Sequence, residues 1–394
     1  MNTIEQFNEH VMQTYGRIGL VMESGHGQTA VGEDGKEYID FGSGIGTNSL
    51  GYCDEDWVNA ICDQAHKIQH TSNYYYTKVQ ADFAKRLCEA TGYEKMFFGN
   101  SGAEANECAI KLARKYSFDK YGKDAERNII ITLVNSFHGR TLCTLSATGQ
   151  EVFHNYFFPF VGGFENVIAN DIDDLMDKLN KLDNKVCAVM FEFVQGEGGV
   201  IPLQQSFVNT IMLECAKRDI LTIADEVQTG VGRTGKLLTS ELYNVKPDIT
   251  TLAKGLAGGV PIGVCLANKK CSEVLGKGTH GSTFGGNPIS CAGGNAVLDK
   301  VTKPEFLEEV RKKGEYFREK LVQIDEVEGV DGLGLMIGVR LKTKKAADVL
   351  NKCFENGLLI LTAKDKLRFL PPLNVSYEQI DKGLAILKKV IDEK

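Results

Sequence analysis

The residues best suited to chemistry follow two apolar stretches in the middle of the chain. One stretch ends in Asp225 and Glu226, and the next delivers Lys254 into a glycine-rich segment. Because strands of an open α/β sheet bind ligands at their carboxyl ends, we expect Asp225 and Lys254 to lie close together. An aspartate facing a pyridinium nitrogen and a lysine that forms an imine are what a protein contributes to pyridoxal chemistry. Each feature alone is weak evidence, since strand-end acids are often caps and lone lysines are usually surface charges.

Two further segments are suited to binding a phosphate group. The segment Gly99–Asn106 leads into a helix whose first residues are small, and a helix start attracts an anion. Asn100 or Ser101 there is also a candidate helix cap with Glu104 as its capping-box partner, and capping is compatible with phosphate binding. The segment His280–Pro288 places two hydroxyl side chains in a glycine-rich turn, which either donates to a phosphate or only connects two parts of the chain.

Charged and aromatic side chains mark three more segments. Phe137 and Arg140 follow an apolar stretch, where the ring could stack on a flat cofactor and the guanidinium could hold a carboxylate through two hydrogen bonds. Glu192 and Glu197 lie after another apolar stretch. Arg368 lies within an apolar segment, which would be costly unless the charge is paired.

Composition and motifs exclude several other classes of function. The net charge is −7 with no block of like charges, so we expect neither a nucleic acid nor a membrane partner. The 11 cysteines form no CxxC pair, which favours reduced thiols in a cytoplasmic protein and no metal site. Residues 230–237 nearly match a nucleotide phosphate loop, but Leu237 replaces the hydroxyl residue that would hold magnesium.

These residues are positioned by alternating strand and helix patterns, which predict a largely parallel α/β sheet. A helix is expected at 206–218, another at 303–324, and a final one ending at Lys394. The strands are expected at 36–41, 128–134, 186–194, 220–224, 249–253, 261–267 and 333–341. We expect a large domain at 55–295, a small C-terminal α+β domain at 296–394, and an N-terminal segment at 1–54 packed against the small domain.

Taken in order, the segments resemble the class III aminotransferase family over nearly the whole chain. DEVQTGVGRTG, the lysine of LAKGL and HGSTFGGNP are the most specific matches. The resemblance implies a pyridoxal 5'-phosphate enzyme of fold type I, in which helices sandwich a mainly parallel central sheet and a smaller α+β domain is attached. It also implies a homodimer with active sites shared between subunits.

The resemblance assigns the cofactor residues. Lys254 would bind the cofactor aldehyde, and Asp225 would face the pyridinium nitrogen. Phe137 and Val227 would cover the two ring faces, with Gln228 near the phenolic oxygen. The phosphate would contact residues of the same chain and of the neighbouring subunit, namely Ser101, Gly102 and Ala103 of the former and Ser282 and Thr283 of the latter.

Within the family, FHGRT, VQGEGG and LRFLPPL most resemble acetylornithine aminotransferases. In these, Arg140 would bind the α-carboxylate of acetylornithine and the side-chain carboxylate of glutamate. Arg368 would bind the α-carboxylate of glutamate, and Glu197 would pair with Arg368 when glutamate is absent. Glu192 is also expected at the substrate site. The expected acceptor is 2-oxoglutarate.

Two positions bear on the choice of donor. Ile45 stands where ornithine aminotransferases tend to have tyrosine, and an apolar residue leaves room for an acyl group. Tyr76 provides an aromatic side chain at the expected entrance to the substrate site. Phe193 departs from the usual proline, and the role of His138 is open. Succinyl-diaminopimelate is a possible additional donor. Succinylornithine, ornithine or 4-aminobutyrate aminotransferase are the alternatives within the family, and a pyridoxal-dependent aminomutase is the alternative outside this reaction class.

Overall fold

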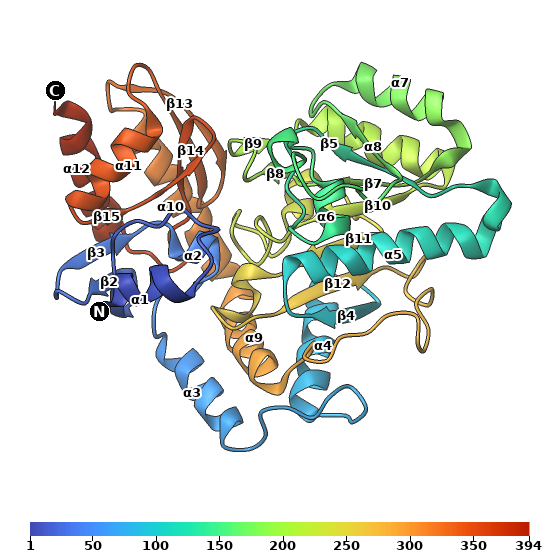
Figure 1. Cartoon of the computed structure of the whole chain (residues 1–394), viewed down its shortest axis with the longest axis horizontal. Coiled ribbons are helices and arrows are strands. Elements are labelled where there is room, and N and C mark those ends of the chain that lie inside the picture. Colours follow the sequence, from blue (N-terminus) through green and yellow to red (C-terminus); the bar gives the residue numbers. More distant parts are fainter. Residues whose placement is uncertain (394) are drawn as a thin grey trace.

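A seven-stranded sheet forms the centre of the computed structural model, which describes residues 1–393 (Figure 1). Neighbouring strands from β11 to β6 are parallel, whereas β12 is antiparallel to both β11 and β4. The sheet order is β4 (Lys95–Gly99), β12 (Gly263–Ala267), β11 (Ile249–Leu252), β10 (Leu221–Asp225), β7 (Val186–Phe191), β5 (Ile129–Leu133) and β6 (Phe164–Val167). The predicted α/β class is therefore confirmed. Five neighbouring strands are parallel, and the sheet becomes mixed at the side formed by β12 and β4.

Helices cover both faces of this sheet because alternate strand residues point to opposite sides. In β7, Val189 and Phe191 pack with α7 (Ile172–Leu182) and α8 (Gln205–Arg218). Ala188 and Met190 pack on the other side with α5 (Gly102–Tyr121), which Figure 1 shows running along the sheet. The remaining helices of this region are α3 (Glu55–Ala65), α4 (Lys78–Thr91), α6 (Leu142–Ala147) and α9 (Pro288–Val301).

The C-terminal part is built around a separate four-stranded sheet. Its strands are β13 (Val327–Leu333), β14 (Met336–Leu341), β17 (Lys366–Phe369) and β16 (Leu361–Ala363), and its helices are α10 (Pro304–Leu321), α11 (Ala346–Glu355) and α12 (Tyr377–Asp392). The predicted helix at 303–324 is α10. The predicted final helix ends at Asp392, and Lys394 lies outside the described residues.

The N-terminal segment joins the C-terminal part through one shared sheet. Its strand β3 pairs in parallel with β15 (Leu358–Leu359), which lies more than 300 residues further along the chain. This pairing supports our proposal of boundaries near residues 54 and 295. The other elements are α1 (Thr3–His10), β1 (Met22–His26), β2 (Thr29–Gly32), β3 (Glu37–Asp40), α2 (Ser43–Gly46), β8 (Val194–Gln195) and β9 (Ile201–Pro202).

No helix within residues 1–393 combines the length and apolar character needed to cross a membrane.

Candidate active site

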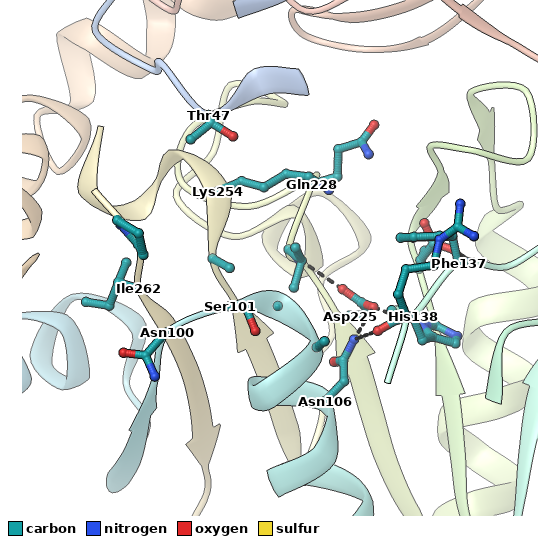
Figure 2. A pocket seen from close by; sticks show the side chains of 18 of the residues that line it. Thr47, Asn100, Ser101, Asn106, Phe137, His138, Asp225, Gln228, Lys254 and Ile262 are labelled. Atoms are coloured by element: carbon teal, nitrogen blue, oxygen red, sulfur yellow. Dashed lines mark hydrogen bonds and ion pairs between the residues drawn. The ribbon is translucent and has the colours of Figure 1, made fainter. Parts of the chain in front are cut away.

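A cavity of about 430 Å³ opens where β10 and β11 end, at the carboxyl edge of the parallel strands (Figure 2). The residues expected to bind the cofactor or substrate that line it are Ser101, Gly102, Ala103, Phe137, Arg140, Glu192, Asp225, Val227, Gln228 and Lys254. The structure thus brings together side chains from segments spread over about 150 residues. The pairing of β10 with β11 explains why Asp225 and Lys254 share one cavity.

Lys254 enters the cavity at the start of a short 3-10 helix, Lys254–Ala257, with a left-handed backbone angle φ of 47°. Burial lowers the pKa of its ammonium group, and the carboxylates of Glu197 and Asp225 oppose this effect. A lowered pKa increases the fraction of neutral amine, which is the form that reacts with a carbonyl carbon. The lysine is therefore suited to act as a nucleophile and as a proton-transfer group.

Asp225 is fixed at the end of β10 by several hydrogen-bond donors. Its carboxylate accepts from the Val227 backbone N–H at 3.0 Å, from Asn106 Nδ2 at 2.8 Å and from His138 Nδ1 at 2.8 Å. Asn106 is itself held, because its Oδ1 accepts from Thr251 Oγ1 at 2.7 Å. These donors together fix the orientation of the Asp225 carboxylate, which lines the cavity.

His138 belongs to this network although its role was open from the sequence. A carboxylate can only accept, so Nδ1 carries the proton that bonds to Asp225. The opposite ring atom, Nε2, is buried and has no hydrogen-bond partner among the described residues. Asn106 also contributes a bond to the His138 carbonyl oxygen at 2.7 Å. No sequence motif signals the contact of Asn106 or His138 with Asp225, because α5, the loop after β5 and β10 are distant in the chain.

The start of α5 provides the space and the donors for a phosphate. Ser101 caps the helix by accepting from the Glu104 N–H at 3.1 Å. A side chain at Gly102 would place its Cβ 2.7 Å from Val227 Cγ1, so any larger residue there would have to displace Val227. The helix is 20 residues long and presents the positive end of its dipole to the cavity. The predicted cap at Ser101 is therefore present, and it leaves the small residues at the start of α5 facing the cavity.

Glu192 supports the backbone around the cavity. Its two carboxylate oxygens accept from the Phe137 N–H at 2.9 Å and from the Gly196 N–H at 3.3 Å. Burial raises the pKa of Glu192 to about 7, while His138 lowers it and Asp225 raises it further. The ring of Phe193, where relatives usually have proline, is fully buried and stacks on Tyr243 with centroids 4.8 Å apart.

Arg368 lies behind Gln228 and is paired as its burial requires. Its Nη1 donates to Glu197 Oε1 at 2.5 Å, and Gln228 Nε2 donates to the same oxygen at 3.3 Å. Burial raises the pKa of Glu197, but the nearby Arg368 charge outweighs this and lowers it overall. Arg368 Nε is buried without a partner among the described residues. The ion pair therefore compensates the charge of this arginine but leaves one of its N–H donors without a partner within residues 1–393.

Six predicted residues do not line the cavity within this chain, namely Glu197 and Arg368, described above, and Ile45, Tyr76, Ser282 and Thr283. Ile45 lies in α2 with a left-handed φ of 61°, and Tyr76 is fully exposed. Ser282 Oγ accepts from Asn100 Nδ2 at 3.1 Å, beside the start of α5, and Thr283 follows it on an outer loop. Within the described residues, no group of His, Cys, Asp or Glu side chains is arranged to hold a metal ion.

Residues 230–237, which resemble a nucleotide phosphate loop, have a structural role. Arg233 is buried and donates to the backbone carbonyls of Leu335, at 3.2 Å, and Pro371. Burial lowers the pKa of Arg233 to about 9. The loop therefore connects the central and C-terminal parts of the chain.

Comparison with known proteins agrees with this geometry. The family model "Aminotransferase class-III" matches residues 11–391, and the chain belongs to this family. It is 51% identical to an acetylornithine aminotransferase of Haemophilus ducreyi, over 98% of this chain and 97% of the relative. An acetylornithine aminotransferase of Caldanaerobacter subterraneus subsp. tengcongensis is 47% identical over 98% of each chain.

Solved structures show the same fold. An ornithine aminotransferase of Toxoplasma gondii superimposes with a TM-score of 0.93 and 31% identity, covering 98% of this chain and 93% of that one. An N-acetylornithine aminotransferase of Stenotrophomonas maltophilia gives a TM-score of 0.85 and 34% identity over 98% of each chain. The protein is thus a pyridoxal-phosphate-dependent aminotransferase of fold type I, which moves an amino group from a donor to a keto acid.

Proposed function

We propose that this enzyme transfers the terminal amino group of N-acetylornithine to 2-oxoglutarate, giving N-acetylglutamate semialdehyde and glutamate for arginine biosynthesis. The observation that carries the proposal is the unequal state of two arginines. Arg140 lines the cavity with no ion pair among the described residues, whereas Arg368 is paired with Glu197. The names of the relatives support the same choice of substrate.

The cavity fits pyridoxal phosphate by the chemistry of its side chains. Lys254 would hold the cofactor aldehyde, Asp225 would pair with the ring nitrogen, and the start of α5 with Ser101, Gly102 and Ala103 would bind the phosphate. Phe137 and Val227 would cover the ring faces, and Gln228 would lie near the phenolic oxygen. When bound, the cofactor supplies an electron-accepting ring that stabilises the carbanion character created at the substrate carbon.

Lys254 performs the proton transfer at that substrate carbon. With the cofactor bound, its amine would take the proton from the donor carbon that carries the amino group and later give a proton up, so one group acts as base and then as acid. The lowered pKa of Lys254 favours the neutral amine that this exchange requires. Fixed hydrogen-bond donors hold the Asp225 carboxylate in one orientation at the cavity.

The two arginines distinguish the two substrates. Acetylornithine has one carboxylate, which Arg140 would bind, and the other arginine then needs Glu197 as its partner. Glutamate and 2-oxoglutarate have two carboxylates, so the second would displace Glu197 and bind Arg368. An unpaired buried arginine is costly, and Glu197 removes that cost during the first half-reaction.

We also propose that the working enzyme is a cytoplasmic homodimer. Ser282 and Thr283 would bind the phosphate held by the neighbouring subunit, and Ile45 and Tyr76 would meet the donor at the completed cavity. The exposed apolar side chains of α1 and of residues 74–76 support burial against another copy. Glu192 would act on substrate through the loops that it holds.

Other donors define the alternatives. Succinylornithine and succinyl-diaminopimelate share the distal acyl group, whereas ornithine and 4-aminobutyrate lack it. An aminomutase would need no acceptor, and the Glu197–Arg368 pair favours a two-substrate reaction over it.

Steady-state kinetics with 2-oxoglutarate as acceptor test this proposal. We expect acetylornithine to give a higher kcat/KM than ornithine or 4-aminobutyrate, with succinyl-diaminopimelate as a possible second substrate. Turnover must also require 2-oxoglutarate. A higher kcat/KM for ornithine, or turnover without an acceptor, would contradict the assignment.

A further inference from the structure

Arg140 lies against two aromatic rings instead of a carboxylate. Its guanidinium carbon is 3.9 Å from the centroid of the Phe153 ring and 5.6 Å from that of the Phe137 ring. The two rings meet edge to face, with centroids 6.0 Å apart. Among the described residues, no ion pair joins Arg140 to an acidic side chain. The arginine is therefore held mainly by the faces of aromatic side chains.

This mode of contact leaves the hydrogen-bond donors of Arg140 free. The N–H groups of a guanidinium lie in its plane, and an aromatic ring that stacks on the face of the group occupies none of them. A carboxylate binds in the same plane through two parallel N–H bonds. Phe153 and a substrate carboxylate can thus hold Arg140 at the same time.

Phe153 is itself held in place by contacts on both sides of it. It ends the short 3-10 helix Glu151–Phe153, and the preceding Gln150 donates to the Ser136 carbonyl oxygen at 3.0 Å. The following His154 ring nitrogen lies 2.9 Å from the Leu145 carbonyl oxygen of α6. Because Ser136 precedes Phe137, the loop that carries Phe153 is tied to the strand end that carries Arg140.

We propose that Phe153 is a positioning residue for substrate binding, which holds the Arg140 guanidinium ready for a carboxylate in both half-reactions. The inference rests on the role of Arg140 in the proposed function and extends it to a residue outside the cavity lining. Before a substrate carboxylate binds, Arg368 and Arg140 are then held by two different kinds of contact. Glu197 occupies an Nη1 donor of Arg368 and must leave, whereas Phe153 occupies only the face of Arg140 and stays.

The direct test is equilibrium binding of glutarate, a dicarboxylate that cannot react, to the cofactor-loaded protein by calorimetry. We expect Phe153→Leu to weaken glutarate binding roughly two- to tenfold, the range of an exposed to partly buried cation–π contact. Phe153→Tyr keeps the ring face and should restore wild-type affinity. Phe157→Leu, in the same exposed loop but without an arginine contact, is the matched control and should leave affinity unchanged.

Kinetics and a double variant separate positioning from a general structural effect. Phe153→Leu should raise KM for both the donor and 2-oxoglutarate while kcat stays within about twofold. In an Arg140→Gln background, Phe153→Leu should cause no further loss of glutarate affinity. Equal loss in the presence and absence of Arg140, or failure of Phe153→Tyr to restore binding, would overturn the inference.

Glutarate is not an amino donor, so this result is independent of the donor's identity. If Phe153→Leu lowers glutarate affinity but ornithine is the better donor, the inference stands and the proposed substrate is wrong. If acetylornithine is the best donor but Phe153→Leu binds glutarate like wild type, the proposed substrate stands and the inference is wrong.

Discussion

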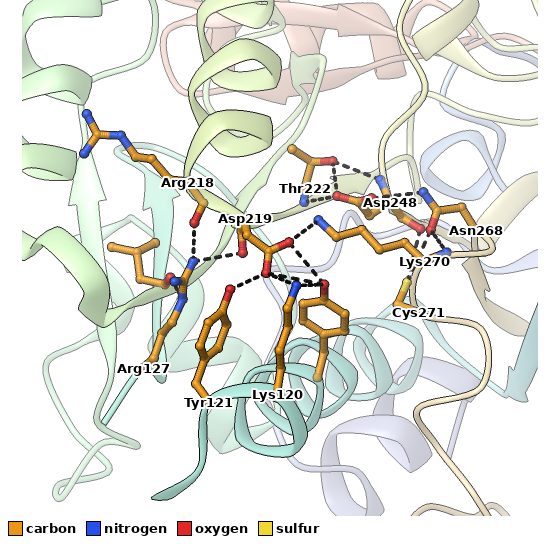
Figure 3. Close-up of polar contacts among 12 residues, drawn as sticks. Lys120, Tyr121, Arg127, Arg218, Asp219, Thr222, Asp248, Asn268, Lys270 and Cys271 are labelled. Carbon is orange, nitrogen blue, oxygen red and sulfur yellow. Dashed lines mark hydrogen bonds and ion pairs between the residues drawn. The ribbon is translucent and has the colours of Figure 1, made fainter. Parts of the chain in front are cut away.

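The same elements connect the amino ends and the carboxyl ends of the central strands, which form two opposite edges of the sheet. Charged side chains are fully paired at the amino edge and only partly paired at the carboxyl edge. At the amino edge, Asp219 accepts hydrogen bonds from Lys120, Tyr116 and Tyr121, and Lys270 lies 3.2 Å from it (Figure 3). Burial raises the pKa of Asp219, but the bond from Lys120 and those beside it hold the pKa well below its usual range. Every charge in this cluster has a partner.

At the carboxyl edge, charges are left available. Lys254 and Arg140 line the cavity without an ion pair among the described residues, and His138 Nε2 and Arg368 Nε are buried without partners there. Strand β10 and helix α5 each run from one edge to the other. The same strand and helix therefore carry charges that are all paired at the amino edge and groups without partners among the described residues at the carboxyl edge. Unpartnered polar groups of this kind indicate a ligand site.

Removing the central lysine at each edge should give the largest contrast. Lys254→Ala is expected to lower kcat by more than about a thousandfold, because the cofactor attachment and the proton-transfer group are both lost. Lys270→Ala removes a lysine of the Asp219 cluster and should leave kcat within about twofold. Steady-state kinetics check both. Wild-type kcat in Lys254→Ala would contradict the assignment of this residue.

Neutralising the aspartate at each edge should separate chemistry from stability. Asp225→Asn keeps the shape but removes the charge that we propose faces the cofactor ring, and we expect kcat to fall by about a hundredfold or more. Asp219→Asn should leave kcat unchanged and lower the free energy of unfolding by less than about 1 kcal/mol, since solvent screens this cluster. Kinetics and urea unfolding measure the two effects. Similar kcat losses in both variants would remove the distinction between the edges.

The Glu197–Arg368 pair should control the balance between substrates. Glu197→Gln leaves Arg368 without a compensating charge, so we expect kcat/KM for 2-oxoglutarate to rise relative to that for acetylornithine by about tenfold. Glu214→Gln is the control, because Glu214 also pairs with an arginine, Arg218, at 3.4 Å but lies far from the cavity along α8. An unchanged ratio in Glu197→Gln would exclude the proposed switch.

The smallest expected effect is on stability: the contributions of Glu192 at the carboxyl edge and Asp219 at the amino edge should change with pH in opposite directions. Burial raises the pKa of Glu192 from 4.5 to about 7, so its contribution to stability is full below pH 4.5 and is lost as pH rises towards 7. The pKa of Asp219 is lowered from 3.8, so its contribution is full above that value and is lost in stronger acid.

Unfolding free energies measured across this pH range check the opposite signs. Glu192→Gln should reduce the decline between pH 4.5 and 7, and part of the decline should remain because burial also raises the pKa of Glu226 to about 7. Asp219→Asn should instead reduce the loss of stability in acid. A steeper decline in Glu192→Gln would show that the sign is wrong.

Much of the fold and site was predictable because the relevant signals are local. An apolar strand followed by Asp225 or Lys254 places each side chain at a sheet edge, and small residues before α5 predict a phosphate site. The edge strands β4 and β6 were not predicted, because the apolar run of β4 is only three residues long, Met96–Phe98, and β6 has polar residues at its centre. The contacts of His138 with Asp225 and of Phe153 with Arg140 depend on how distant loops pack, so no sequence spacing reveals them.

The most direct measurement of the central claim is to locate the cofactor on the chain. Reduction of the loaded enzyme with borohydride fixes the cofactor to the lysine that holds it, and peptide mass spectrometry then identifies that residue. We predict that the label lies on Lys254 alone and is absent from Lys254→Ala. A label on another lysine, such as Lys364 or Lys270, would contradict the account.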